Sequence, residues 1–88
     1  MIERTAVIVN PLGLHARPAA QIVKLASEFA SHVEVEKDSF AVNCKSIMGV
    51  MMLAAEKGST LNFRADGPDE TAAVEALVNL VATGFGER

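Results

Sequence analysis

The chain has 88 residues, of which 50% are hydrophobic, and eight Lys and Arg against eleven Asp and Glu give a formal net charge of −3. A half-apolar chain of this size forms one core, so we expect a single domain over residues 1–88 and exclude a disordered protein. The acidic balance argues against a protein that binds nucleic acid, because such proteins are usually basic.

Cys44 is the single cysteine, so no disulfide forms within the chain. This fits the reducing cytoplasm better than a disulfide-framed secreted domain. The first ten residues lack the basic segment and long apolar run of a secretory signal, and no apolar run approaches the ~18 residues of a membrane span. We therefore predict a cytoplasmic protein without membrane insertion. No spacing of His, Cys, Asp and Glu resembles a metal site.

The first two elements are predicted from a change in apolar period. Residues 2–9 alternate in hydrophobicity, which indicates a strand. From Ala16 the apolar residues recur at helical spacing, and Pro18 suits a first turn, because its missing N–H loses no hydrogen bond there. The predicted inner stripe of this helix consists of Ala19, Ile22, Val23, Ala26, Phe29 and Ala30.

A hairpin and a short helix are predicted next. Residues 32–37 and 39–44 alternate and form two strands joined by a tight turn, with Phe40, Val42 and Cys44 on one face. Ser46 is a good N-cap for a short helix, because its hydroxyl accepts a hydrogen bond from a first-turn N–H.

The remaining elements complete the pattern β-α-β-β-α-β-α. Residues 60–66 alternate as a fourth strand. Pro68 and the two acids after it start the last helix, and residues 83–88 read as a frayed tail. One apolar face on each strand and one apolar stripe on each helix predict an α+β fold, with helices covering one face of an antiparallel sheet.

The start of the first helix carries the candidate site. The backbone N–H groups of Ala16 and Arg17 have no intrahelical partner, and the helix dipole adds a partial positive charge there. Such a helix start suits an anion, above all a phosphate. Arg17 adds a charged, planar fork of donors that matches phosphate oxygens.

His15 lies at the mouth of this anion site. A neutral imidazole nitrogen is a nucleophile that can carry a phosphoryl group covalently, and both the dipole and Arg17 favour the neutral ring. Gly13 allows a sharp turn that leaves the ring open to a partner protein. In isolation, however, such a histidine is more often a helix cap beside a solvated arginine, so the rest of the pattern has to decide.

Two motifs, "GLHARPA" preceded by Asn10 and "KSIMGVMML" some thirty residues later, decide it. Together they resemble HPr, the histidine-containing phosphocarrier family of the bacterial phosphoenolpyruvate:sugar phosphotransferase system, from about Ile2 to about Val81. The resemblance implies an open-faced two-layer sandwich with a four-stranded antiparallel sheet, strand order 1-4-2-3, covered on one face by three helices.

The resemblance also implies a function. The family takes a phosphoryl group from phosphorylated enzyme I onto Nδ1 of the histidine that matches His15, and passes it to sugar-specific IIA proteins or domains. Arg17 matches the family's active-site arginine. Such a protein is a carrier rather than an enzyme and needs no cofactor of its own. The family often has an acidic residue near its C-terminus, but we assign no role to Glu87 or Arg88.

Ser46 matches the family's regulatory serine, which the HPr kinase/phosphorylase modifies in hosts that have it. A phosphate there adds about −1.5 to −2 charges at neutral pH, which would repel an acidic partner. We expect this regulation here. The alternative is that Ser46 only caps its helix.

The short helix after Ser46 is too apolar to bury all its side chains. We assign Val50 and Leu53 to the core, and Ile47, Met48 and Met51 to a partly exposed surface that docks partners. The alternative is that all of them cover the edge of the sheet. In the resembled family this stretch contacts enzyme I, IIA and the kinase.

Three other functions stay open. A carrier of the nitrogen-linked branch uses the same histidine, although "KSIMGVM" with Ser46 favours the sugar branch. A regulatory binding module of the same fold is disfavoured by His15, because its near relatives lack the active histidine. A nucleic-acid-binding domain is disfavoured by charge. We expect a monomer, with His32 facing solvent and Cys44 packed as a small apolar group.

Overall fold

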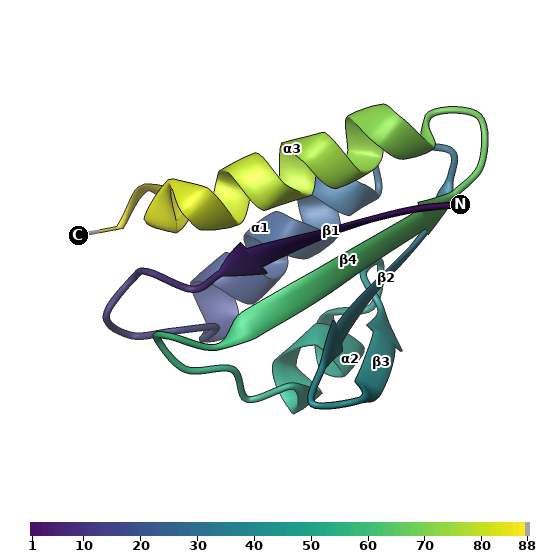
Figure 1. The fold of residues 1–88 in the computed structure, drawn as a ribbon. Helices are drawn as coiled ribbons and strands as arrows, with labels where there is room; N and C mark the ends of the chain where they lie inside the picture. Colours follow the sequence, from purple (N-terminus) through teal and green to yellow (C-terminus); the bar gives the residue numbers. More distant parts are fainter. Residues whose placement is uncertain (88) are drawn as a thin grey trace.

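A computed structural model describes residues 1–87 of the chain. Four strands and three helices, followed by a short 3-10 helix, run in the predicted order (Figure 1): β1 Ile2–Val7, α1 Ala16–Ala26, β2 His32–Lys37, β3 Phe40–Asn43, α2 Ile47–Met52, β4 Thr60–Asp66, α3 Glu70–Ala82 and η1 Gly84–Gly86.

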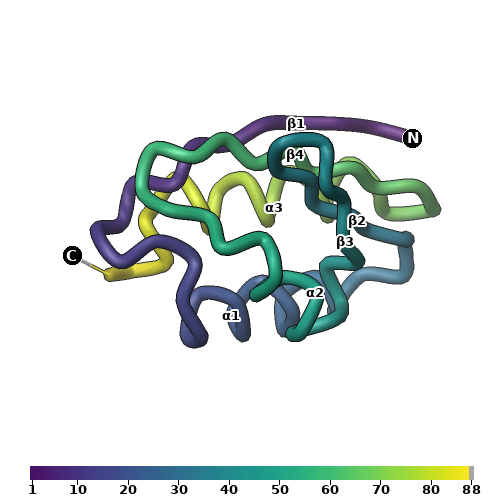
Figure 2. The backbone as a smooth tube through the Cα atoms, turned by 90° about the horizontal axis from the view of Figure 1, so that it is seen from below, coloured from purple at the N-terminus to yellow at the C-terminus, as the bar shows by residue number. Residues whose placement is uncertain are grey.

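The strands form one antiparallel sheet in the order β1-β4-β2-β3, which confirms the order implied by the resemblance. In its register, Phe63 of β4 pairs with Arg4 of β1 on one side and Val35 of β2 on the other. The three helices lie on the same side of the strands (Figure 2), which leaves the opposite face of the sheet open. The α+β open-faced sandwich is therefore confirmed.

The core lies between the sheet and the helices and follows the predicted alternation. The inward residues of β2 and β4 and the inner stripes of α1 and α3 are buried, and they include Val33, Val35, Leu61, Phe63, Ala65, Ala19, Ile22, Ala26, Val74, Leu77 and Val81. Cys44 is also buried, as predicted, and desolvation raises the pKa of its thiol to about 12. Phe40 is an exception: it opens the edge strand β3 beside the hairpin turn and is exposed. The end of the predicted first-helix stripe is another, because α1 stops at Ala26, and Ala30 beyond it is exposed.

Two predictions about the second half of the chain are wrong. One is the start of the last helix: α3 begins at Glu70 rather than at Pro68. The carboxylate of Asp69, the N-cap residue, makes no capping hydrogen bond. That carboxylate instead accepts hydrogen bonds from the N–H groups of Ala30 and Ser31, both at 2.9 Å, which ties the α1–β2 loop to the start of α3.

The other concerns the tail: residues 83–87 are folded rather than frayed, and Arg88 lies outside the described residues. Residues Gly84–Gly86 form the 3-10 helix η1, and Phe85 is only 5% exposed. The hydrophobic side chain of Phe85 is buried in the core cluster, and this burial is the physical reason that the tail is held.

Candidate functional site

The site is built around the first turn of α1. His15 is the N-cap residue in an extended conformation (φ −82°, ψ −172°), and its side chain makes no capping hydrogen bond. The N–H of Ala19 donates to the carbonyl of His15 at 3.0 Å, and Pro18 has no N–H. The amides of Ala16 and Arg17 are therefore the two first-turn donors without an intrahelical acceptor.

The loop before α1 fixes the position of His15. The N–H of Leu14 donates to the carbonyl of Ala55 at 2.8 Å, and Leu14 is buried. Gly13 has φ +67°, and a Cβ there would lie 2.6 Å from the oxygen of Ala55. Only glycine fits this left-handed, close approach, so the loop is clamped while the His15 side chain stays 36% exposed.

A carboxylate from the other end of the chain lies against the ring. Nε2 of His15 is 2.8 Å from Oε2 of Glu87, and the amide nitrogen of the buried Asn10 donates to Oε1 of Glu87 at 2.9 Å. The hydrogen bond from His15 and the one from Asn10 hold the pKa of Glu87 below its usual value, and the positive charge of Arg17 acts in the same direction. Glu87 is therefore ionised near neutral pH.

The sequence alone does not place Glu87 beside His15, because residues 83–88 are predicted to be a frayed tail. The signal for an ordered tail is present in the sequence: a hydrophobic Phe85 between two glycines just after a helix end. In the sequence Asn10 stands out only as the residue that precedes the first motif. Its hydrogen bond to the carbonyl of Gly13 is local, whereas its hydrogen bond to Glu87 depends on the tertiary fold.

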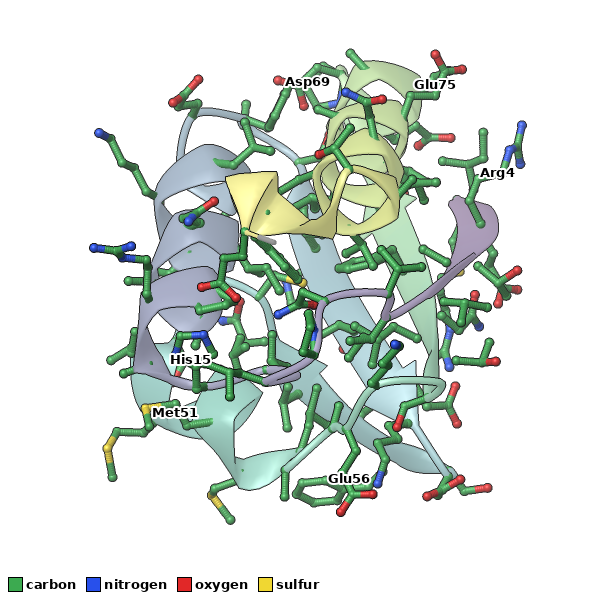
Figure 3. The ribbon with its side chains drawn as sticks, turned by 90° about the vertical axis from the view of Figure 1, so that its left-hand side faces the viewer. Arg4, His15, Met51, Glu56, Asp69 and Glu75 are labelled. Carbon is green, nitrogen blue, oxygen red and sulfur yellow. The ribbon has the colours of Figure 1, made fainter. Side chains whose placement is uncertain are left out.

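An apolar surface adjoins the site on α2, which packs against α1. Val50 and Leu53 are buried, whereas Ile47, Met48 and Met51 are exposed, Met48 by 71%. The predicted division of this helix into core and surface is confirmed. Figure 3 shows Met51 on the same side of the molecule as His15.

Two further apolar side chains, outside the three predicted docking residues, are also exposed. Leu12, in the loop before His15, is 75% exposed, and Met52 on α2 is 66% exposed. We call Leu12, Ile47, Met48, Met51 and Met52 together the apolar patch.

Ser46 caps α2 as predicted. Its hydroxyl oxygen accepts a hydrogen bond from the N–H of Gly49 at 3.1 Å, which satisfies one of the free donors at the helix start. The helix that carries most of the apolar patch therefore begins at a serine that is partly exposed.

Within residues 1–87, no group of three or more His, Cys, Asp or Glu is arranged to hold a metal ion. No helix in the same part of the chain has the length and apolar character needed to cross a membrane.

Comparison with known proteins decides the family. The family model described as the PTS HPr component phosphorylation site matches residues 2–83. The chain belongs to the HPr family. Its general role is that of a phosphocarrier of the phosphotransferase system, and HPr proteins are carriers rather than catalysts.

Individual members of the HPr family are similar over almost the whole chain. Phosphocarrier protein HPr of Cupriavidus necator is 51% identical over 87 residues, which cover 99% of this chain and 98% of that protein. The crystal structure of HPr-C-His from Thermoanaerobacter tengcongensis is 50% identical, with a TM-score of 0.95, and the match covers 100% of this chain and 99% of that one.

A further crystal structure from Thermoanaerobacter tengcongensis is described as an HPr dimer. It is also 50% identical and has a TM-score of 0.79, with 99% of this chain and 100% of that one covered. The expectation that the present chain is a monomer stays a prediction.

Proposed function

We propose that His15 is the residue that carries the phosphoryl group, which it accepts from phosphorylated enzyme I and passes to sugar-specific IIA proteins or domains. The observation that carries this proposal is the start of α1. A partly exposed imidazole lies at a helix start whose amides have no side-chain cap.

The transfer needs no cofactor in the carrier. The lone pair of Nδ1 forms a bond to phosphorus, while the bond between phosphorus and the donor atom of enzyme I breaks and its electron pair stays with enzyme I. The reverse exchange with a IIA protein releases the histidine. Partner active sites complete both steps, so the carrier acts as a stoichiometric relay.

Arg17 and the first amides of α1 stabilise the phosphoryl group on His15. Arg17 is exposed and follows His15 by two residues, so its guanidinium can turn toward the oxygens of a phosphate on the histidine. The N–H groups of Ala16 and Arg17, together with the positive end of the helix dipole, supply further donors.

The apolar patch is the docking surface for these partners. Its centre consists of Ile47, Met48 and Met51, which are exposed on α2. This helix packs against α1, and Figure 3 shows Met51 on the same side of the molecule as His15. Flexible methionine side chains adapt to partners of different shape, which suits a carrier that must fit enzyme I and several IIA proteins in turn.

Ser46 is the site of regulatory phosphorylation by an HPr kinase/phosphorylase. A phosphate on its hydroxyl stays at a helix N-terminus, where negative charge is tolerated. It also places about −1.5 to −2 charges at the edge of the apolar patch. A partner with an acidic docking surface is then repelled, and phosphoryl uptake on His15 slows.

The carrier works as a monomeric domain spanning residues 1–88 in the cytoplasm. The half-exposed apolar patch has to stay free for partners, which favours a monomer in the working state.

Labelling with enzyme I tests the assignment of His15. The protein is incubated with radiolabelled phosphoenolpyruvate and enzyme I, and the modified residue is mapped by mass spectrometry. His15→Ala should abolish the acid-labile label while the circular dichroism spectrum is unchanged. His32→Ala is the matched control, since the His32 side chain is 61% exposed at the start of β2. Full labelling of His15→Ala would refute the assignment.

Onward transfer separates the two branches of the system. The labelled protein is mixed with a sugar-specific IIA protein or with a IIA protein of the nitrogen branch. Faster transfer to the sugar-specific IIA protein is expected, and preference for the nitrogen-type IIA protein would reassign the branch.

A further inference from the structure

We infer that Glu87, held in place by Asn10, is a positioning residue that fixes the tautomer of His15, with the proton on Nε2 and the lone pair on Nδ1. The use of that lone pair in phosphoryl transfer rests on the proposed function. The tautomer itself is a property of the free protein and is tested without any partner.

The contact between ring and carboxylate selects one tautomer. In a neutral imidazole one nitrogen is a donor and the other an acceptor, whereas an ionised carboxylate only accepts. Nε2 of His15 lies 2.8 Å from Oε2 of Glu87. A proton on Nε2 makes this a charge-assisted hydrogen bond, whereas a lone pair on Nε2 would face the negative oxygen and be repelled.

Asn10 orients the carboxylate. Its Nδ2 donates to Oε1 of Glu87 and to the carbonyl of Gly13, both at 2.9 Å. Turning the amide over would point its oxygen at these two acceptors, so the observed orientation is the one that forms hydrogen bonds. Asn10 is only 2% exposed, and it links the carboxylate to the loop that carries His15.

The 3-10 helix η1 brings Glu87 to this position. Phe85 is buried in a left-handed conformation (φ +58°) between Gly84 and Gly86, and the N–H of Glu87 donates to the carbonyl of Gly84 at 2.9 Å. A Cβ on Gly84 would lie 3.5 Å from the Val9 side chain, so the tail packs directly against the segment that contains Asn10.

The arrangement removes a proton transfer from the phosphorylation step. With the proton already on Nε2, Nδ1 attacks phosphorus directly, and no proton has to leave the ring. The phosphorylated ring then carries a positive charge on the side that faces Glu87, and the carboxylate compensates this charge.

Nitrogen NMR of the free, histidine-labelled protein tests the inference. Spectra are recorded at about pH 8 to 9, where a reference histidine is neutral, and the ¹⁵N shifts of Nδ1 and Nε2 give the tautomer ratio. The wild-type ring should be almost entirely in the Nε2–H form. In Glu87→Gln the amide can donate as well as accept, so the ratio of Nε2–H to Nδ1–H should fall by about tenfold or more.

Two other variants make the result specific. Glu87→Ala removes the acceptor and should also lower the ratio. Glu75→Gln removes the same charge from the exposed face of α3, away from His15 (Figure 3), and should leave the ratio unchanged. The rate of phosphoryl uptake is not the readout, because loss of Glu87 also removes a negative charge that repels the incoming phosphoryl group.

The outcomes separate the tautomer from the proposed function. A tautomer ratio in Glu87→Gln and Glu87→Ala equal to that of the wild type overturns the inference, even if His15 takes up phosphate. A ratio that falls in both variants supports the inference, even if enzyme I labels another residue, and in that case only the proposed function fails.

Discussion

The starts of α1 and α2 differ in what lies over their first backbone amides. At α2 the hydroxyl of Ser46 accepts from the N–H of Gly49. At α1 the N-cap residue is His15, whose side chain turns away from the helix to Glu87. The closed start contributes to stability, whereas the open start leaves donors free for an anion. The free donors of α1 therefore cost the fold a hydrogen bond, and in the proposed function they bind the phosphate.

The start of α3 shows a third arrangement. The carboxylate of Asp69 does not cap its own helix but accepts from the N–H groups of Ala30 and Ser31 and from the Ser31 hydroxyl. The three N-cap residues thus differ in their roles: His15 belongs to the proposed site, Ser46 caps its own helix, and Asp69 links a distant loop to α3. The residue type at an N-cap does not by itself show which of these roles the residue has.

The largest effect is expected from removing the cation at the open start. Arg17→Ala should slow phosphoryl uptake from enzyme I by about a hundredfold, the usual cost of one donor to a developing anion. Lys24→Ala is the matched control, because it removes the same charge from the last turn of the same helix. Rates measured by quenched flow should show the loss only for Arg17→Ala. Equal losses of uptake rate in Arg17→Ala and Lys24→Ala would mean that the net charge of the protein, and not the start of α1, attracts the phosphate.

Opening the closed start should cost stability. Ser46→Ala leaves the N–H of Gly49 without its acceptor, and the free energy of unfolding in urea should fall by about 1 kcal/mol. Ser27→Ala, at the exposed C-cap of α1, should change it little. Uptake of phosphate on His15 should be the same in both variants. An unchanged free energy for Ser46→Ala would show that water replaces the cap at no cost.

Closing the open start should raise stability. His15→Ser places a hydroxyl at an N-cap that already has extended dihedral angles. Its free energy of unfolding should exceed that of His15→Ala by about 0.5 to 1 kcal/mol, although neither variant carries phosphate. A serine no more stable than alanine would contradict the view that the amides of α1 lack a cap.

The smallest expected effect is on the stability of the fold at the start of α3, and it is seen only when the pH is lowered. The hydrogen bond from the Ser31 side chain, followed by that from the Ala30 N–H, holds the pKa of Asp69 below its usual value, which is about 3.9. The stability that this carboxylate contributes is therefore fully present above that value and is lost as the pH falls through the lowered one.

Urea unfolding of Asp69→Asn across pH 2 to 7 measures that contribution. The difference from wild type should be constant above about pH 5 and should shrink below about pH 4. Glu28→Gln, at an exposed position just after the end of α1, serves as the control, and its difference from wild type should not shrink in this way. A difference that persists at the lowest pH would assign the effect to packing rather than to the charge of Asp69.

Local pattern predicted most of the fold and the place of three residues of the proposed site. Val33 and Val35 alternate in sequence and are buried, and the spacing of Ile22 and Leu77 matches the buried faces of their helices. His15, Ala16 and Arg17 are neighbours in the chain, so their common place at a helix start follows from sequence. The predicted burial of Phe40 is wrong, because alternation along a strand does not show how far the helices cover the sheet.

The sequence alone determined which segments form strands and helices, where the first helix begins, and which apolar side chains of α2 are in excess of its buried face, because all of these depend on residues within a few positions of one another. Only the tertiary structure decided that Glu87 lies against His15, that Asn10 joins them, and that Asp69 holds a distant loop. These contacts join residues 38 to 77 positions apart. They form only because the packed core, with Phe85 in it, brings both ends of the chain to one place.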